Sequence, residues 1–293
     1  MNDAVKIRKL TKTYGSSRGI TELDLTVREG DIFGFIGPNG AGKSTTIRTL
    51  LGLIRPTSGS ASVLGHDIVT ENGMILEEVG YLPSEINFYS GMKVRDVIRF
   101  SASMRRAKCS DKADKLLERL NLDPGRKIDD LSLGNRKKVG IVAAIQHSPK
   151  LLILDEPTSG LDPLVQREFF EILKEENGRG ATIFLSSHVL SEVQTYCKSA
   201  AFIRDGRIII HDEVSKLESA GSRKVVIRGD VDPSLVTGAT DIRREGNEIS
   251  FLYRGDASAL ISKLSSCRVD DILITEPSLE DIFMGYYEGE LKK

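Results

Sequence analysis

The sequence predicts an α/β fold organised around a parallel sheet that helices cover on both faces. Five short apolar segments alternate with helical stretches, and apolar segments without polar alternation are typical of strands buried on both faces. A glycine-rich loop directly follows the first segment, at the turn from a strand to a helix. The five predicted strands span residues 32–36, 79–82, 151–154, 182–185 and 200–203.

Three further regions surround this predicted sheet. The first thirty residues alternate apolar and polar side chains, which predicts an antiparallel sheet at the N-terminus. From about residue 90 to 149 apolar residues recur three and four positions apart, which predicts a helical insertion. The pair Asp205-Gly206 predicts a two-residue hairpin that closes a first domain, residues 1–214. Residues 215–293 are expected to form a small C-terminal α/β accessory domain.

Composition and charge narrow the class of protein. The 293 residues include 41 lysines and arginines against 42 aspartates and glutamates, so the formal net charge is −1. This balance disfavours a protein that holds nucleic acid mainly by neutralising phosphates. No apolar run approaches the roughly 18 residues of a membrane-spanning helix, and the charged N-terminus is unlike a secretory signal. Three widely spaced cysteines, Cys109, Cys197 and Cys267, indicate reduced thiols in the cytoplasm.

The glycine-rich loop fits the pattern G-x-x-x-x-G-K-[ST] and leads into an amphipathic helix. Its glycines allow successive backbone N–H groups to face a phosphate, and the helix N-terminus adds the positive end of its dipole. Lys43 is then expected to reach the β- and γ-phosphates, and the Ser44 hydroxyl to bind Mg²⁺. The sequence therefore predicts a nucleoside triphosphate site formed by Gly37, Pro38, Asn39, Gly40, Ala41, Gly42, Lys43, Ser44 and Thr45.

Two carboxylates, Asp155 and Glu156, follow the predicted strand at residues 151–154. Because ligands of open α/β sheets lie at the carboxyl ends of the strands, we expect this pair to face the same crevice as the phosphate loop. Asp155 is predicted to hold Mg²⁺, and Glu156 to act as general base toward the attacking water. Neighbouring residues of a strand point to opposite faces, so the role of Glu156 requires the chain to turn at Pro157. The alternative for Glu156 is a surface acid beside that turn.

These motifs resemble those of the nucleotide-binding subunits of ATP-binding cassette (ABC) transporters. The loop GPNGAGKST and the segment LLILDEPTSGLDP are similar to the two nucleotide motifs of that family, and the latter runs into its D-loop at residues 159–162. Residues 131–135, with Ser132 and Gly134, resemble the family signature LSGGQ. Ser187-His188 resembles the switch histidine, and Tyr14 the aromatic that stacks on adenine. The resemblance covers about residues 4–215, with six motifs in the family's order.

The resemblance implies a P-loop cassette fold and hydrolysis of ATP with Mg²⁺. In this family the signature of one subunit closes over the ATP of another. Ser132 and Gly134 are therefore expected to bind ATP in a head-to-tail dimer, with a second copy or with a related cassette. His188 is expected to contact the γ-phosphate or the attacking water, and Tyr14 the adenine.

The same resemblance implies a partner and a location. We expect a cytoplasmic protein held at the inner face of the membrane by a separate integral membrane permease, with no nucleic acid partner. The C-terminal segment EPSLEDIFMGYY is similar to the endings of exporter subunits. Two positions depart from the family pattern: Leu133 replaces a signature glycine, and Ser84 stands where a glutamine usually contacts Mg²⁺ and the membrane subunit.

Plainer interpretations stay open. Ser132 alone is typical of a helix N-cap, His188 of a satisfied histidine at a strand end, and Tyr14 of a core aromatic. Two other functions compete: a soluble cassette ATPase that remodels nucleic acid or ribosomes, and a regulatory module that binds ATP without cleaving it. The first usually carries paired cassettes or coiled-coil arms, and this chain has one cassette and no heptad repeat. Glu156 argues against the second.

Overall fold

The computed structural model describes residues 2–15, 17–105, 109–218, 222–231, 238–265, 267–278 and 280–283. The chain divides into two compact units, Met1–His211 and Asp212–Lys293. Each unit has its own hydrophobic core, and each is described by itself.

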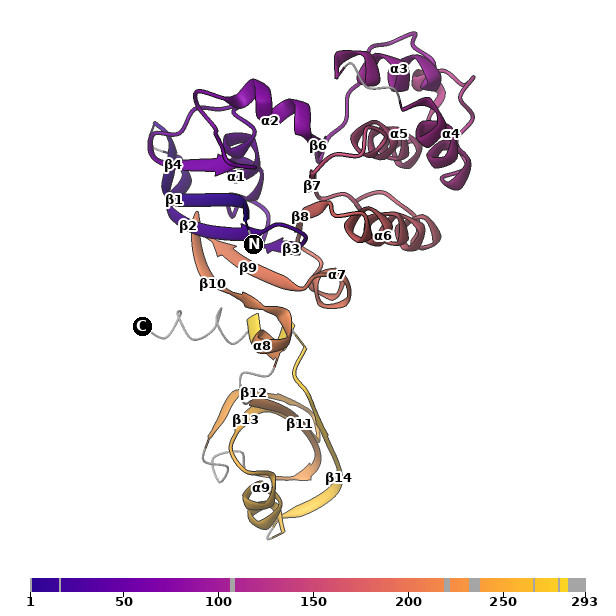
Figure 1. Cartoon of the computed structure of the whole chain (residues 1–293). Coiled ribbons are helices and arrows are strands. Elements are labelled where there is room, and N and C mark those ends of the chain that lie inside the picture. Colours follow the sequence, from indigo (N-terminus) through magenta and orange to yellow (C-terminus); the bar gives the residue numbers. More distant parts are fainter. Residues whose placement is uncertain are drawn as a thin grey trace. The chain divides into compact units, whose positions relative to one another are not determined.

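The first unit is built on a six-stranded sheet with the strand order β10-β9-β3-β8-β7-β6 (Figure 1). Strands β6, β7, β8, β3 and β9 run parallel to their neighbours, as their pairing registers show. The predicted parallel α/β fold is therefore confirmed. The strands are β3 (Ile32–Ile36), β6 (Val79–Leu82), β7 (Leu151–Asp155), β8 (Thr182–Ser187), β9 (Ser199–Arg204) and β10 (Arg207–Glu213).

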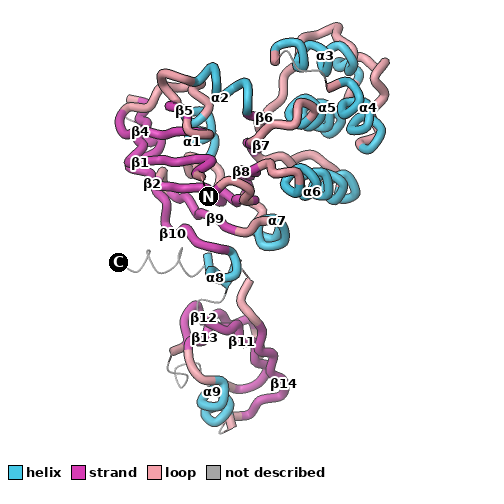
Figure 2. The backbone as a smooth tube through the Cα atoms, in the orientation of Figure 1, coloured by secondary structure: helices cyan, strands magenta, loops and turns pink. Residues whose placement is uncertain are grey.

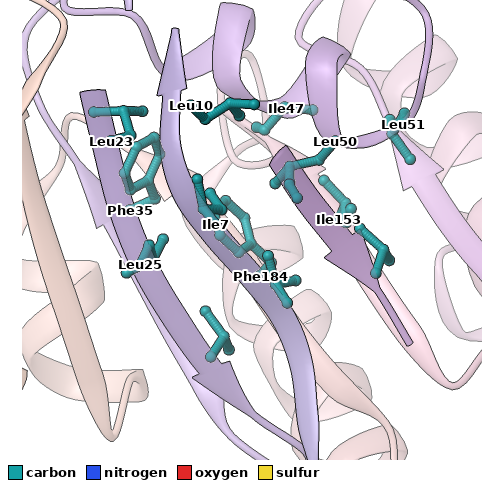
Figure 3. Packing of buried hydrophobic residues seen from close by; sticks show 14 of the residues in the cluster. Ile7, Leu10, Leu23, Leu25, Phe35, Ile47, Leu50, Leu51, Ile153 and Phe184 are labelled. Atoms are coloured by element: carbon teal, nitrogen blue, oxygen red, sulfur yellow. The ribbon is translucent and has the colours of Figure 1, made fainter. Parts of the chain in front are cut away.

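A second sheet of the same unit is antiparallel and has the order β2-β1-β4-β5. Its strands are β1 (Asp3–Tyr14), β2 (Ser17–Arg28), β4 (Ser58–Val63) and β5 (His66–Asp67). Leucines and isoleucines of this sheet meet helix α1 (Lys43–Leu50) and phenylalanines of the central sheet in one core, shown in Figure 3. That core fixes the phosphate loop, because the loop connects β3 to α1 at its edge.

Helices occupy the predicted insertion, as Figure 2 shows. They are α3 (Val94–Met104), α4 (Ser110–Arg119), the 3₁₀ turn Ile128–Asp130 and α5 (Leu133–Ile145). The remaining helices of the unit are α2 (Asn72–Glu78), α6 (Pro163–Gly178) and α7 (Leu190–Tyr196). The turn between β9 and β10 is the predicted hairpin, since Asp205 and Gly206 both have positive φ, 50° and 74°.

The second unit contains a four-stranded antiparallel sheet in the order β12-β13-β11-β14. Its elements are α8 (Val214–Glu218), β11 (Ser222–Asp230), β12 (Ala239–Glu245), β13 (Glu248–Arg254), α9 (Ala257–Leu264) and β14 (Arg268–Thr275). Leu260 and Leu264 of α9 pack with apolar residues of β11 and β13. Within the described residues, none of the helices is long and apolar enough to cross a bilayer.

Candidate active site

The phosphate loop turns sharply between β3 and α1. Gly40 and Gly42 have positive φ, 80° and 111°, which side chains rarely allow. A Cβ at Gly37 would stand 2.3 Å from the carbonyl oxygen of Ile203, so only glycine fits there. The loop is also tied to the hairpin after β9, because the Gly206 N–H donates to the carbonyl of Ala41 at 2.9 Å. Backbone and packing therefore fix the loop before any ligand enters.

Lys43, the first residue of α1, directs its buried side chain back into this loop. Its Nζ donates to the carbonyl oxygens of Gly37 at 2.5 Å and Pro38 at 3.2 Å. Glu156 Oε1 lies 3.2 Å from the same Nζ, in an ion pair without hydrogen-bond geometry. The lysine of the phosphate loop and the acid after β7 therefore meet directly, although they lie 113 positions apart in the sequence.

Glu156 meets Lys43 because the chain turns at Glu156 itself. Its φ is 49°, in the left-handed region, and its N–H donates to the carbonyl of Ser186 at 3.1 Å. The turn continues through Pro157, where the sequence predicted it, since the Ser159 N–H donates to the carbonyl of Glu156 at 3.4 Å. The left-handed backbone releases Glu156 from strand alternation, so its side chain turns toward the loop while Asp155 stays buried in the sheet.

His188 is the second partner of Glu156. Its Nδ1 lies 2.7 Å from Glu156 Oε2, at the position that follows β8. The ring is half exposed, so its other nitrogen can reach a group that enters the site. The glutamate thus lies between the ammonium of Lys43 and the ring of His188, whose Nδ1 donates to it in the tautomer that carries the hydrogen there.

Asp155 is 1% exposed and ends β7. The Ser186 hydroxyl donates to its Oδ1 at 2.5 Å, while its Oδ2 is buried without a hydrogen-bond partner among the described residues. A buried carboxylate oxygen with a free lone pair is a suitable ligand for a hard cation such as Mg²⁺. The donor set therefore fits the magnesium predicted from the sequence.

A cavity of about 250 Å³ lies over the phosphate loop. It is lined by Gly19, Pro38, Asn39, Gly40, Gly42, Lys43, Ser44, Thr45, Ser84 and Glu156. Ser84 thus belongs to the site, at the place of the family's glutamine. Tyr14 is not a core residue, since 45% of its side chain is exposed. It lies beside the cavity residue Gly19, where a Cβ would come within 3.3 Å of the tyrosine ring.

Ser132 and Gly134 are not among the residues that line this cavity in the described part of the chain. Ser132 caps α5, since its hydroxyl accepts from the Asn135 N–H at 3.3 Å. Leu133 is exposed and leans on the D-loop, with its Cδ2 3.5 Å from where a Cβ of Gly160 would stand. The side chain of Leu133 therefore lies near Gly160 of the same chain, and Ser132 at the start of α5 is exposed to solvent.

Three polar residues of this region escaped the sequence reading. Ser186 orients Asp155 and binds the turn at Glu156. Glu192 accepts from the Ser187 hydroxyl at 2.9 Å, and burial, with a smaller contribution from the charge of Glu156, raises its pKa. Lys137 of α5 is buried behind Ser84. The sequence offered a signal only for Ser186, because two serines end an otherwise apolar strand. No neighbouring residues indicate a role for Glu192 or Lys137.

Known proteins resemble this chain in sequence over nearly its whole length. A family model described as ABC transporter matches residues 20–159. The bacitracin transport ATP-binding protein BcrA of Bacillus licheniformis is 38% identical over 305 aligned positions, 99% of each chain. The chain belongs to the ABC transporter family. The Nod factor export ATP-binding protein I of Rhizobium meliloti is 32% identical over 99% of this chain and 89% of that one.

The fold of this ABC subunit agrees with a solved structure as well. The structure of an ATP binding subunit of an ABC transporter superposes with a TM-score of 0.71 at 27% identity, covering 74% of this chain and 92% of that one. The chain is therefore an ATP-binding subunit of an ABC transporter and an ATPase, as the motifs indicated. Within the first unit, Glu156 connects the phosphate-loop lysine Lys43 to His188.

Proposed function

We propose that this ABC subunit hydrolyses ATP to drive export through a separate membrane subunit. The observation that carries the proposal is the cluster of Lys43, Glu156 and His188 at the mouth of the phosphate loop. A cation for phosphate, a carboxylate for water and a second donor are the groups that cleavage of a γ-phosphate requires. The names of the two relatives, which concern bacitracin transport and Nod factor export, support export.

The chain's own groups divide the work of hydrolysis. Phosphate entering the cavity competes with Glu156 for the Lys43 ammonium, which leaves the carboxylate available to water. Glu156 then accepts a proton from that water. His188, which contacts the same carboxylate, orients the carboxylate for this step at the γ-phosphate. Ser44 and Asp155 would hold Mg²⁺, which neutralises charge on the phosphates when bound. Exposed Tyr14 would stack on the adenine.

Two copies would complete the site. Ser132 presents a hydroxyl, and the N-terminus of the 13-residue helix α5 presents backbone N–H groups, on a surface away from the chain's own cavity. In a head-to-tail dimer, with a second copy or a related cassette, this turn of one subunit would cover the γ-phosphate held by the other. Such a subunit would work in the cytoplasm, at the inner face of the membrane.

Purification from detergent-solubilised membranes tests the proposal. The tagged chain should copurify with a polytopic membrane protein, and that partner should stimulate ATP hydrolysis. Copurification with nucleic acid, in a yield that falls steeply with salt, would instead favour a cassette that remodels nucleic acid or ribosomes. ATP binding without measurable turnover in the complex would favour the regulatory module.

A further inference from the structure

Lys137 is a buried cation that lies behind the wall of the cavity. It stands in α5, five residues after Ser132, and its side chain is 3% exposed. Its ammonium donates to the backbone carbonyls of Pro83 at 3.2 Å and Ser84 at 3.0 Å. Since Ser84 lines the cavity, Lys137 connects one cavity wall to the helix that begins at the signature.

A second contact presses the same helix against the same segment. A Cβ at Gly140 would stand 2.4 Å from Ile86 Cδ1 and 2.9 Å from Leu82 Cδ1. Residues three apart share a helix face, so Lys137 and Gly140 both face the segment that follows β6. The lysine holds that chain by hydrogen bonds, and the glycine lets it lie close.

Burial of this ammonium is unfavourable unless its surroundings compensate it. Burial lowers the pKa of Lys137 to about 8, while the charges of Asp155 and Glu156 act in the opposite direction. A methionine would fill a similar space without a charge, but it would leave the carbonyls of Pro83 and Ser84 without this donor. The lysine therefore gives the cavity wall two hydrogen bonds that an apolar side chain of similar size cannot make.

We propose that Lys137 is a positioning residue for ATP hydrolysis, holding residues 83–84 in the cavity wall and coupling them to the signature helix. It acts through the backbone of Ser84, since Lys137 itself is not among the described residues that line the cavity. This inference rests on the proposed hydrolysis at Glu156. It predicts an effect on turnover and little effect on nucleotide affinity.

The test compares Lys137→Met and Lys137→Gln with the control Lys138→Met, which removes the same charge one position along α5. Lys137→Met should lower kcat about 10- to 100-fold, as small displacements in an active site do, with KM for MgATP within about threefold of wild type. Lys137→Gln keeps N–H donors toward the two carbonyls and should recover at least about one third of the wild-type kcat. Lys138→Met should keep wild-type kinetics.

Hydrogen exchange separates positioning from general structural damage. In Lys137→Met the amides of residues 84–89 should exchange faster, while those of residues 37–45 stay unchanged. A kcat within about twofold of wild type, a change in KM alone, or faster exchange in the phosphate loop as well would overturn the proposal. If the methionine variant does not fold, Lys137→Ala, which also lacks a donor toward the two carbonyls, decides by the same two measurements. Glu156→Gln, measured in parallel, reports on the proposed hydrolysis independently.

Discussion

At the scale of single residues, the site depends on one strained backbone. Glu156 holds φ at 49°, a conformation that costs a residue with a side chain about 1–3 kcal/mol. The neighbouring strand maintains it, because carbonyl and hydroxyl oxygens of Ser186 both lie within hydrogen-bond distance of the Glu156 N–H. This backbone conformation directs two successive carboxylates to different places: Asp155 stays buried in the sheet, and Glu156 contacts Lys43 of the phosphate loop.

His188→Ala is predicted to lower kcat about 100-fold while MgATP affinity stays near wild type, because the histidine orients the base and lies outside the phosphate loop. Steady-state kinetics and calorimetric titration with MgATP measure the two effects. His66→Ala is the matched control, since His66 of β5 pairs with Glu71, the residue before α2, and its loss should leave turnover unchanged. Equal loss in both variants would argue against a role for His188.

Asp155→Asn keeps the shape of the side chain and the oxygen that accepts from Ser186, and removes the charge offered to Mg²⁺. We predict that turnover is lost and that Mg²⁺ no longer strengthens ATP binding, because a neutral amide is a weaker ligand for a hard cation. Calorimetric titrations with ATP, with and without Mg²⁺, measure this. An unchanged response to Mg²⁺ in the variant would remove Asp155 from the metal site.

At the scale of elements, close contacts between helix and sheet keep the site in register. A Cβ at Gly34 of β3 would stand 2.4 Å from Val193 Cγ1 of α7, the helix that follows His188. Gly34→Ala is therefore predicted to destabilise the fold by about 1–3 kcal/mol, as overpacking does. Gly178→Ala, at the exposed end of α6 where no atom lies within 4 Å of the new Cβ, should be neutral or stabilising by about 0.5 kcal/mol. Urea unfolding compares them, and equal midpoints would contradict the packing argument.

Elements buried on both faces were the most predictable from the sequence. The parallel strands could be predicted because apolar residues run unbroken for most of their length. The structure explains this pattern, since every residue of β3, β7 and β8 is buried. Strands β4 and β12 were missed, because SGSASV and ATDIRRE carry small or charged side chains and lie largely exposed. Pairing holds both in place: β4 pairs with β1, which is distant in sequence, and β12 pairs with β13, which directly follows it.

The site divides in the same way. The phosphate loop and the acid pair follow local patterns, so their chemistry was readable from neighbouring residues. Three other features of the site depend on contacts between residues 30 to 113 positions apart. They are the hydrogen bond from Glu156 to Ser186, the ion pair of Lys43 with Glu156, and the hydrogen bond from Lys137 to Ser84. No local pattern encodes such contacts, and only the folded chain reveals them.

At the scale of the whole molecule, stability should depend on pH through a partly buried histidine. Burial, followed by the positive charge of Arg105, lowers the pKa of His147 from 6.5 to about 4, and the charge of Lys112 adds to this effect. Between these values the unfolded chain binds more protons than the folded chain, so the free energy of unfolding must fall as pH falls from about 6.5 to about 4.

His147→Gln is predicted to reduce this dependence, because the variant has no imidazole to protonate in the unfolded state. Urea unfolding at pH 7.0, 6.0, 5.0 and about 4.5 measures the slope for both proteins. A variant whose slope in this window equals that of wild type would show that other groups govern the acid response. Above pH 7 the two slopes should coincide.

The central claim is that the phosphate loop and Glu156 act on the same ATP molecule. Glu156→Gln tests it most directly when MgATP binding and phosphate release are measured on one preparation. We predict that the dissociation constant for MgATP stays within about threefold of wild type while phosphate release falls at least about 100-fold. Phosphate release at the wild-type rate in the variant would contradict the claim.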